Sequence, residues 1–178
     1  PVLIPPPSEQ RAISAYIDRE TFKIDGLITE QKRLIELLQE QRQSIISNAV
    51  SKGMNPDAPV MPTGVEWLGD VPEHWSIERG RRLFRQLDLP PDPDDGVVTA
   101  FRDGQVTLRE NRRTDAFTLA TLEVGYQKVR AGDLVIHGMD AFAGAIGVSE
   151  STGKCTPEYS VLEPARPDLE NRYFALVL

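Results

Sequence analysis

The chain has 178 residues, of which 40% are hydrophobic and 26% are charged, with a formal net charge of −7 at pH 7. This balance is ordinary for a soluble protein with at least one packed core, and it argues against a strongly basic protein that coats nucleic acid. Residues 1–63 carry 7 basic and 8 acidic side chains and residues 64–178 carry 13 and 19, so any DNA binding must depend on local clusters of arginine.

The chain shows no sequence signal for a membrane or for export. No stretch approaches the roughly 20 apolar residues that a membrane-spanning helix needs, and the first residues lack the charged and then apolar order of a signal peptide. We therefore expect a cytoplasmic protein. The single cysteine, Cys155, cannot form an internal disulfide and has no Cys or His at ligand spacing, so redox and metal-binding roles are not expected.

A long helix is predicted over residues 8–53. Three consecutive prolines precede it and cannot be helical, whereas Ser8 is a residue type that caps helix N-termini. From there to Lys52 the chain has no proline and one glycine, Gly26, among many Leu, Ile, Glu, Gln and Arg residues. A basic last turn followed by Gly53 is typical of a helix end. About 44 residues in one helix would extend for roughly 66 Å.

The apolar residues of this helix follow a seven-residue repeat. They recur in alternating steps of four and three, which is the pattern of a coiled-coil seam. We assign the following seam residues to a subunit interface: Ile17, Ile24, Leu27, Leu34, Leu38 and Ile45. Polar residues on the same seam would help to fix register and partner: Glu20, Gln31, Gln41 and Asn48. Because so long a helix is not stable alone in water and the chain has no second one, we expect a partner helix from elsewhere.

The rest of the chain is predicted to be mostly β. A proline-containing linker over 54–63 leads into a domain over 64–178 that begins with a short helix around Arg79–Gln86. Gly and Asp turns separate six predicted strands: Val97–Phe101, Gln105–Leu108, Tyr126–Val129, Asp133–Ile136, Ala145–Ser149 and Tyr159–Leu162. The predicted fold class is therefore α+β, with a long coiled-coil helix followed by a mostly β domain. An apolar run over 174–178 without a cap or closing turn suggests that this domain is incomplete.

Seven polar side chains of the β domain are candidate DNA contacts. Arginine can bind phosphates, and in the major groove arginine can grip guanine and glutamine can grip adenine. The candidates are Arg79, Arg82, Arg102, Gln105, Arg109, Arg112 and Arg113. Those in the predicted short helix, which also holds Arg81 and Arg85, suit phosphates, and those beside predicted strands suit bases. The alternative is a solvated polar face whose arginines form ordinary ion pairs with Asp103, Glu110 and Asp115.

Other conspicuous residues favour structural roles. Trp67, Trp75 and Phe142 could stack on bases, but their surroundings in the sequence predict core anchors. His137 and Asp140 have no second His and no nucleophilic Ser or Cys placed beside them, so a structural role is favoured over acid–base catalysis. Some glycines are too sparse for a phosphate-binding loop and are interpreted as turns: Gly144, Gly147 and Gly153.

Most of the chain resembles the specificity subunits of type I restriction–modification systems. Ile4-Pro-Pro-Pro-Ser-Glu-Gln-Arg-Ala-Ile13 and Leu34-Ile-Glu-Leu-Leu-Gln-Glu40 look like the spacer region of that family. Gly64-Val-Glu-Trp-Leu-Gly-Asp-Val-Pro-Glu-His-Trp75 resembles its entry into a target-recognition domain. The later β core of that domain is similar to Gly132-Asp-Leu-Val-Ile136, Met139-Asp-Ala-Phe142 and Pro157-Glu-Tyr-Ser160. The match is most specific over residues 4–75 and less so over 130–162.

This resemblance implies a non-catalytic DNA reader. Members typically have two recognition domains separated by two long helices that pair antiparallel, and the helix length sets the distance between the halves of a bipartite target. The implied partners are double-stranded DNA, modification subunits that methylate adenine, and restriction subunits that translocate and cut DNA. The chain would bind no cofactor, whereas its partners would use S-adenosylmethionine, ATP and magnesium. Residues 1–7 would then be the tail of a preceding region, 8–53 a spacer helix, 54–63 a linker and 64–178 a truncated recognition domain.

Two other classes of function stay open. A coiled-coil adaptor whose β domain binds protein or carbohydrate would account equally well for the acidic balance and for the seam. A standalone enzyme is a weaker hypothesis, because the sequence has no nucleotide-binding glycine loop, metal-ligand cluster or nucleophile–base pair. Salt-sensitive binding to duplex DNA would separate the reader from the adaptor, because the affinity of phosphate contacts falls with salt.

Overall fold

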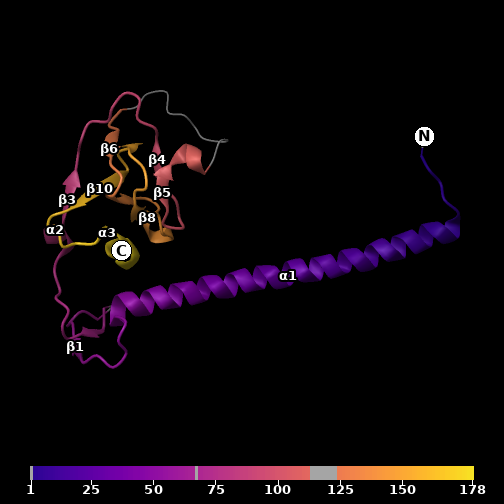
Figure 1. Ribbon diagram of the computed structural model, residues 1–178, viewed down its shortest axis with the longest axis horizontal. Coiled ribbons are helices and arrows are strands. Elements are labelled where there is room, and N and C mark those ends of the chain that lie inside the picture. The colour runs from indigo at the N-terminus through magenta and orange to yellow at the C-terminus, as the bar shows by residue number, and fades with distance from the viewer. Residues whose placement is uncertain (1, 67, 113–123) are drawn as a thin grey trace. The chain divides into compact units, whose positions relative to one another are not determined.

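The computed structural model describes residues 2–66, 68–112 and 124–178. The chain forms two compact units, Pro1–Ala49 and Val50–Leu178. Figure 1 shows one long helix followed by a unit made mostly of short strands, so the predicted α+β class is confirmed. Across the described ranges, no helix is both long and apolar enough to cross a membrane.

The long helix α1 runs from Pro7 to Lys52. The expectation that all three prolines lie outside the helix is wrong for Pro7, because proline suits the first helical position, where its missing N–H would have no partner. The backbone N–H of Gln10 donates to the carbonyl oxygen of Pro6 at 3.0 Å, which places Ser8 inside the first turn. The prediction that Ser8 caps the helix is therefore wrong. At the other end, Gly53 adopts the left-handed conformation with a φ of 73°, as the C-terminal signal predicted.

The apolar stripe of α1 is open to solvent. The helix has no buried residue, and the exposed fractions of the seam residues run from 48% for Leu34 to 61% for Ile45. Such a stripe contributes to stability only when a partner covers it, because the hydrophobic effect depends on removing apolar area from water. Coiled-coil pairing of this helix stays a prediction.

The second unit opens with a small hairpin that the sequence did not predict. β1 (Val60–Pro62) pairs antiparallel with β2 (Asp70–Pro72), inside and just after the segment expected to be a linker. The half-buried ring of Trp75 lies close to Gly53, because a Cβ built there would be 3.3 Å from Trp75 Cζ2. Trp67 lies outside the described residues.

Within the described residues, eight further strands surround the core of this unit, and every pair that shares a ladder is antiparallel. A four-stranded sheet has the order β3 (Phe84–Leu87), β10 (Tyr159–Pro164), β7 (Leu134–His137) and β8 (Ile146–Val148). The two smaller sheets are β4 (Val98–Ala100) with β5 (Val106–Leu108), and β6 (Gln127–Val129) with β9 (Gly153–Cys155).

Single backbone links join these sheets into a ring. A bridge between Val106 and Ser149 connects β5 to the end of β8, and a bridge between Val97 and Lys154 connects β4 to β9. The ring closes where the N–H of Lys128 in β6 donates to the carbonyl of Leu89, just beyond β3, at 2.8 Å. Side chains that alternate along these strands therefore share one interior.

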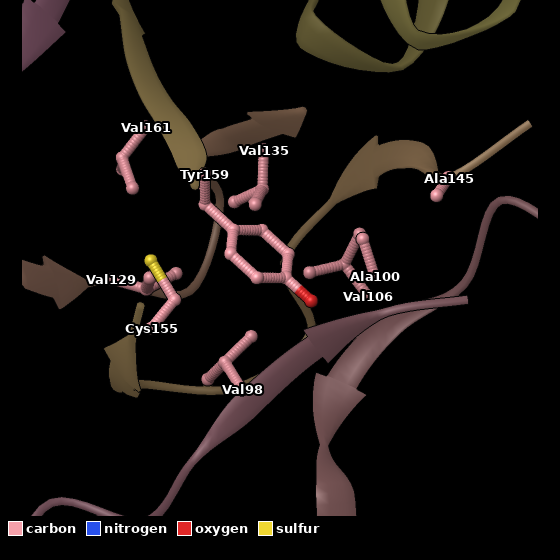
Figure 2. Packing of buried hydrophobic residues seen from close by; sticks show 9 residues of the cluster. All are labelled: Val98, Ala100, Val106, Val129, Val135, Ala145, Cys155, Tyr159 and Val161. Carbon is pink, nitrogen blue, oxygen red and sulfur yellow. The ribbon is translucent and has the colours of Figure 1, made fainter. Parts of the chain in front are cut away.

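The interior is filled by small aliphatic side chains around one aromatic ring. Figure 2 shows Tyr159 at the centre of this cluster, with Cys155 among the side chains beside it. Burial raises the pKa of the Cys155 thiol to about 12, and burial also raises the pKa of Tyr159. The other members of the cluster are Val98, Ala100, Val106, Val129, Val135, Ala145 and Val161.

All six predicted strands are present, but the predicted helix over Arg79–Gln86 is only half right. α2 covers Gly80–Leu83, and the chain then becomes β3. The reason is tertiary: β10 pairs with residues 84–87, and the Phe84 ring meets that of Phe174 edge-to-face at 4.9 Å. A sequence pattern cannot show a strand partner that lies some 75 residues further along the chain.

Two other expectations are corrected. Gly147 and Gly153 lie in strands β8 and β9 rather than in turns, because neighbouring backbone approaches both residues closely; only Gly144 lies in a turn, with a φ of 93°. The apolar run over 174–178 does have a cap. It belongs to helix α3 (Asn171–Val177), where the side chain of Glu170 accepts a hydrogen bond from the N–H of Arg172 at 3.1 Å.

We predict that Gly147→Ala destabilises the second unit by about 1–3 kcal/mol, the usual cost of overpacking. The added Cβ would lie 2.1 Å from the carbonyl oxygen of Gly104, so β8 and the β4–β5 hairpin would have to separate. Alkylation of the buried Cys155 in increasing denaturant measures the unfolding free energy of this unit. Gly26→Ala is the matched control, because its Cβ meets nothing within 4 Å. Equal unfolding curves for Gly147→Ala and the unchanged chain would contradict the prediction.

Candidate nucleic-acid interface

The candidate DNA contacts lie on two separate parts of the second unit. Four of them, which we call the hairpin cluster, lie on or beside the β4–β5 hairpin and the following 3-10 helix η1 (Arg109–Asn111): Arg102, Gln105, Arg109 and Arg112. The other part is the arginine segment, which lies in and around α2: Arg79, Arg81, Arg82 and Arg85. Arg113 lies outside the described residues.

A tight turn presents the hairpin cluster. The N–H of Phe101 donates to the carbonyl of Gln105 at 2.8 Å, and the N–H of Gly104 donates to the carbonyl of Phe101 at 2.9 Å. Gly104 has a φ of 86°, a left-handed conformation that glycine adopts without strain. The turn therefore holds Arg102 and Asp103 at its tip, where both side chains reach solvent.

Arg112 is engaged by the hairpin itself. Its Nη1 donates to Asp103 Oδ1 at 2.8 Å, and its Cζ lies 4.3 Å from the centroid of the Phe101 ring. The hydrogen bond from Arg112 holds the pKa of Asp103 below its usual value. The ion pair expected for a solvated polar face is thus present at Asp103, whereas Asp115 lies outside the described residues.

Arg102 is held at one of its nitrogens and otherwise open to solvent. Nη2 donates to Asp140 Oδ1 at 3.0 Å, and the side chain is 71% exposed. Asp140 is positioned in turn by His137, whose Nδ1 lies 3.3 Å from Oδ2 and whose ring lies against Tyr159 with centroids 4.5 Å apart. The guanidinium therefore has a fixed direction while its remaining N–H donors stay available.

Gln105 and Arg109 are more restricted. Gln105 Nε2 donates to Glu150 Oε2 at 3.0 Å, so a bidentate contact with adenine would require that bond to break. Arg109 is half-buried, and its Nε donates to Thr99 Oγ1 at 3.3 Å. Of the hairpin cluster, Arg102 is the side chain that can meet DNA with the least rearrangement.

The arginine segment differs from the hairpin cluster in its ion pairing. Its four side chains are exposed, and no carboxylate in the described part of the chain forms an ion pair with any of them. The expectation that they share one helix is wrong, because Arg79 precedes α2 and Arg85 lies in β3. Unpaired guanidinium groups so close together suit phosphate contacts, for which no carboxylate has to be displaced.

The prediction for Phe142 is also wrong. The predicted core anchor is 90% exposed, in the middle of the 3-10 helix η2 (Ala141–Ala143), and Met139 beside it is 67% exposed. The signal that could have revealed this is their place between Gly138 and Gly144. A short segment bounded by glycines is typical of a loop, and loops lie mostly at the protein surface.

The described residues contain no group of three or more His, Cys, Asp or Glu side chains that could hold a metal ion. His137 lies beside Asp140, and Asp140 also accepts a hydrogen bond from Arg102. The pair therefore supports the loop that contains Asp140. The hydrogen-bond donors of Arg102 and the exposed Phe142 ring are suited to binding.

The chain was compared with protein families, curated proteins and solved structures. No protein-family model matches the chain, and no curated protein matches it. Among solved structures, the crystal structure of an HsdS subunit from Thermoanaerobacter tengcongensis aligns with a TM-score of 0.40 and 18% sequence identity. The alignment covers 97% of this chain and 41% of that one, so the chain spans about two fifths of the length of that subunit.

We predict that Asp103→Asn raises the affinity of the chain for duplex DNA roughly threefold and steepens its salt dependence by about one phosphate contact. The change removes the carboxylate that occupies Arg112 and frees this guanidinium. Fluorescence anisotropy with a labelled duplex at several salt concentrations measures both quantities. Asp94→Asn makes the same change of charge at an exposed loop residue, and an equal effect there would show that only net charge matters.

Proposed function

We propose that the chain is the DNA-recognition part of a type I restriction–modification specificity subunit. In this role it catalyses nothing itself and directs adenine methylation and DNA cleavage by partner subunits to a bipartite site. The observation that carries the proposal is α1: a helix of 46 residues without a buried side chain, directly followed by a β unit. A rigid spacer needs that length, and its open apolar stripe needs a second helix.

The sequence resemblance supports the same proposal from another side. The stretches that resemble the family's spacer fall mainly on α1, and the stretch that resembles the entry to its recognition domain includes β2 and Trp75. The stretches that resemble the later β core fall on β7, η2 and the start of β10. In the proposed complex the seam contacts partner helices, and the second unit contacts DNA.

The two groups of arginines have different proposed roles. The arginine segment supplies phosphate contacts, which position a protein on DNA without reading its sequence. The hairpin cluster supplies base contacts, with Arg102 oriented by Asp140 and the other members released from their partners as DNA approaches. The net charge of −7 accords with this division, because non-specific affinity can come from the partner subunits.

A coiled-coil adaptor is the second candidate, and one observation favours it. Arg102, Gln105 and Arg112 all donate to carboxylates, which are the acidic groups that a protein partner would present to this surface. An adaptor would show no salt-sensitive affinity for duplex DNA, which separates the two candidates.

We predict that replacing Arg79, Arg81 and Arg82 together by Ala weakens binding to every duplex to a similar degree. The slope of log affinity against log salt should fall by up to about 3, because each lost phosphate contact removes about 0.9. Fluorescence anisotropy on unrelated duplexes provides the measurement. The matched control removes Arg11, Arg33 and Arg42, three exposed arginines of α1. If both triple variants lose the same slope, the arginine segment has no special role.

We further predict that the gene encoding this chain determines one bipartite N6-methyladenine motif in its source cell. Deletion should erase methylation at that motif, and the intact gene should restore it, as a genome-wide methylation map would show. A gene carrying Leu34→Asp and Leu38→Asp should not restore it, because charges on the seam prevent helix pairing. Gln39→Asp and Gln43→Asp have the same spacing off the seam and should restore it.

An unchanged map after deletion, with the modification subunit shown to be active, would contradict the proposed function. Restoration by the Leu34 and Leu38 variant would contradict only the role of the seam. The two outcomes therefore separate the function of the chain from the way in which it assembles.

A further inference from the structure

Phe142 is exposed on a loop that is held in one shape. The β7–β8 loop, Gly138–Gly144, carries it between two strands of the main sheet. Within the loop, the N–H of Ala143 donates to the carbonyl of Asp140 at 2.9 Å, and the N–H of Ala145 donates to the same carbonyl at 3.2 Å. The N–H of Gly138 donates across to Glu158 at 3.0 Å. The ring is thus kept in water by an ordered backbone.

The loop is fastened to the hairpin that carries Arg102. Asp140 accepts the hydrogen bond from Arg102 Nη2, and a Cβ at Gly144 would lie 2.5 Å from the backbone oxygen of Arg102. The two loops therefore touch through backbone as well as through side chains. This contact brings the loop that carries Met139 and Phe142 against the turn that carries Arg102, and all three side chains are exposed.

We propose that Phe142 is a base-contacting residue of the DNA reader, making apolar contact with a base in a groove while Arg102 donates to a neighbouring base edge. This inference rests on the proposed function. DNA fits these groups because Arg102 is 71% exposed and bonded at one nitrogen, so its other guanidinium donors stay open on the turn next to the loop of Phe142. The floor of a DNA groove offers apolar surface and hydrogen-bond acceptors side by side.

Affinity measurements on two kinds of duplex test this contact. The full chain first selects its preferred sequence from a pool of random duplexes of about 40 base pairs, and affinities are then measured for the selected duplex and for the pool. Phe142→Ala should bind the selected duplex about tenfold more weakly, which is the lower end of the cost of losing one specific base contact in a duplex. Affinity for the pool and the salt slope should stay unchanged, because no charge is removed.

Three further variants sharpen the result. Phe22→Ala removes an equally exposed phenylalanine, 80% exposed, from α1 and should behave like the unchanged chain. Phe142→Trp should keep most of the affinity for the selected duplex. Arg102→Lys retains the charge but not the fork of donors, so it should lose affinity for the selected duplex alone. Phe142 lies in solvent, so its substitution should leave the core unchanged. Because Cys155 is buried, unchanged alkylation of this residue in all variants would verify that the fold is intact.

The possible failures are distinguishable. A wild-type chain that enriches no sequence, both alone and together with its modification subunits, overturns the proposed function together with this contact. If the unchanged chain selects a sequence and Phe142→Ala binds that sequence with equal affinity, the contact alone is overturned. Equal losses on the selected duplex and on the pool also overturn it, because the ring would then contribute without contacting a particular base.

Discussion

The close approach of the β4–β5 hairpin to β8 and β9 is the constraint on which the second unit depends. A Cβ at Gly147 would meet the carbonyl of Gly104, and a Cβ at Gly153 would lie 2.4 Å from the carbonyl of Gly96. Backbone can approach backbone this closely only where side chains are missing. The approach closes the ring of strands around Tyr159, and it brings the tip of the hairpin against the β7–β8 loop. Packing of the core and construction of the candidate interface are thus consequences of the same contacts.

The charged side chains of the second unit fall into two groups that the net charge does not reveal. Carboxylates occupy the charged and amide groups at the hairpin tip, while the arginine segment has none within the described part of the chain. An ion pair at the surface contributes little to stability, so the carboxylates at the hairpin mainly orient the groups that they bind. A protein with a net charge of −7 can therefore present both free cations and pre-oriented donors. The first kind suits phosphate, and the second suits a specific partner.

The helix α1 has a different energetic basis. A strand in the second unit is stabilised by neighbours from the same chain, but α1 has intrahelical hydrogen bonds, i,i+3 pairs such as Lys23 with Glu20, and an uncovered apolar stripe. Those local terms are small, and most helical stability in proteins comes from packing of the apolar face. The second unit thus has a core of its own, whereas α1 buries its apolar stripe only when a partner covers it.

Local patterns in the sequence determined the long helix, its glycine end, the seven-residue repeat and six strands, because these depend on residues a few positions apart. They also located the arginines, although not their partners. Tertiary structure alone decided that residues 84–87 are a strand beside β10, that Gly147 and Gly153 permit close packing, and that Phe142 lies in solvent. The pairing of Arg102 with Asp140 was equally hidden, because 38 positions separate the two residues. Each of these outcomes depends on contacts between distant segments, and no local period in a single sequence records which segments meet.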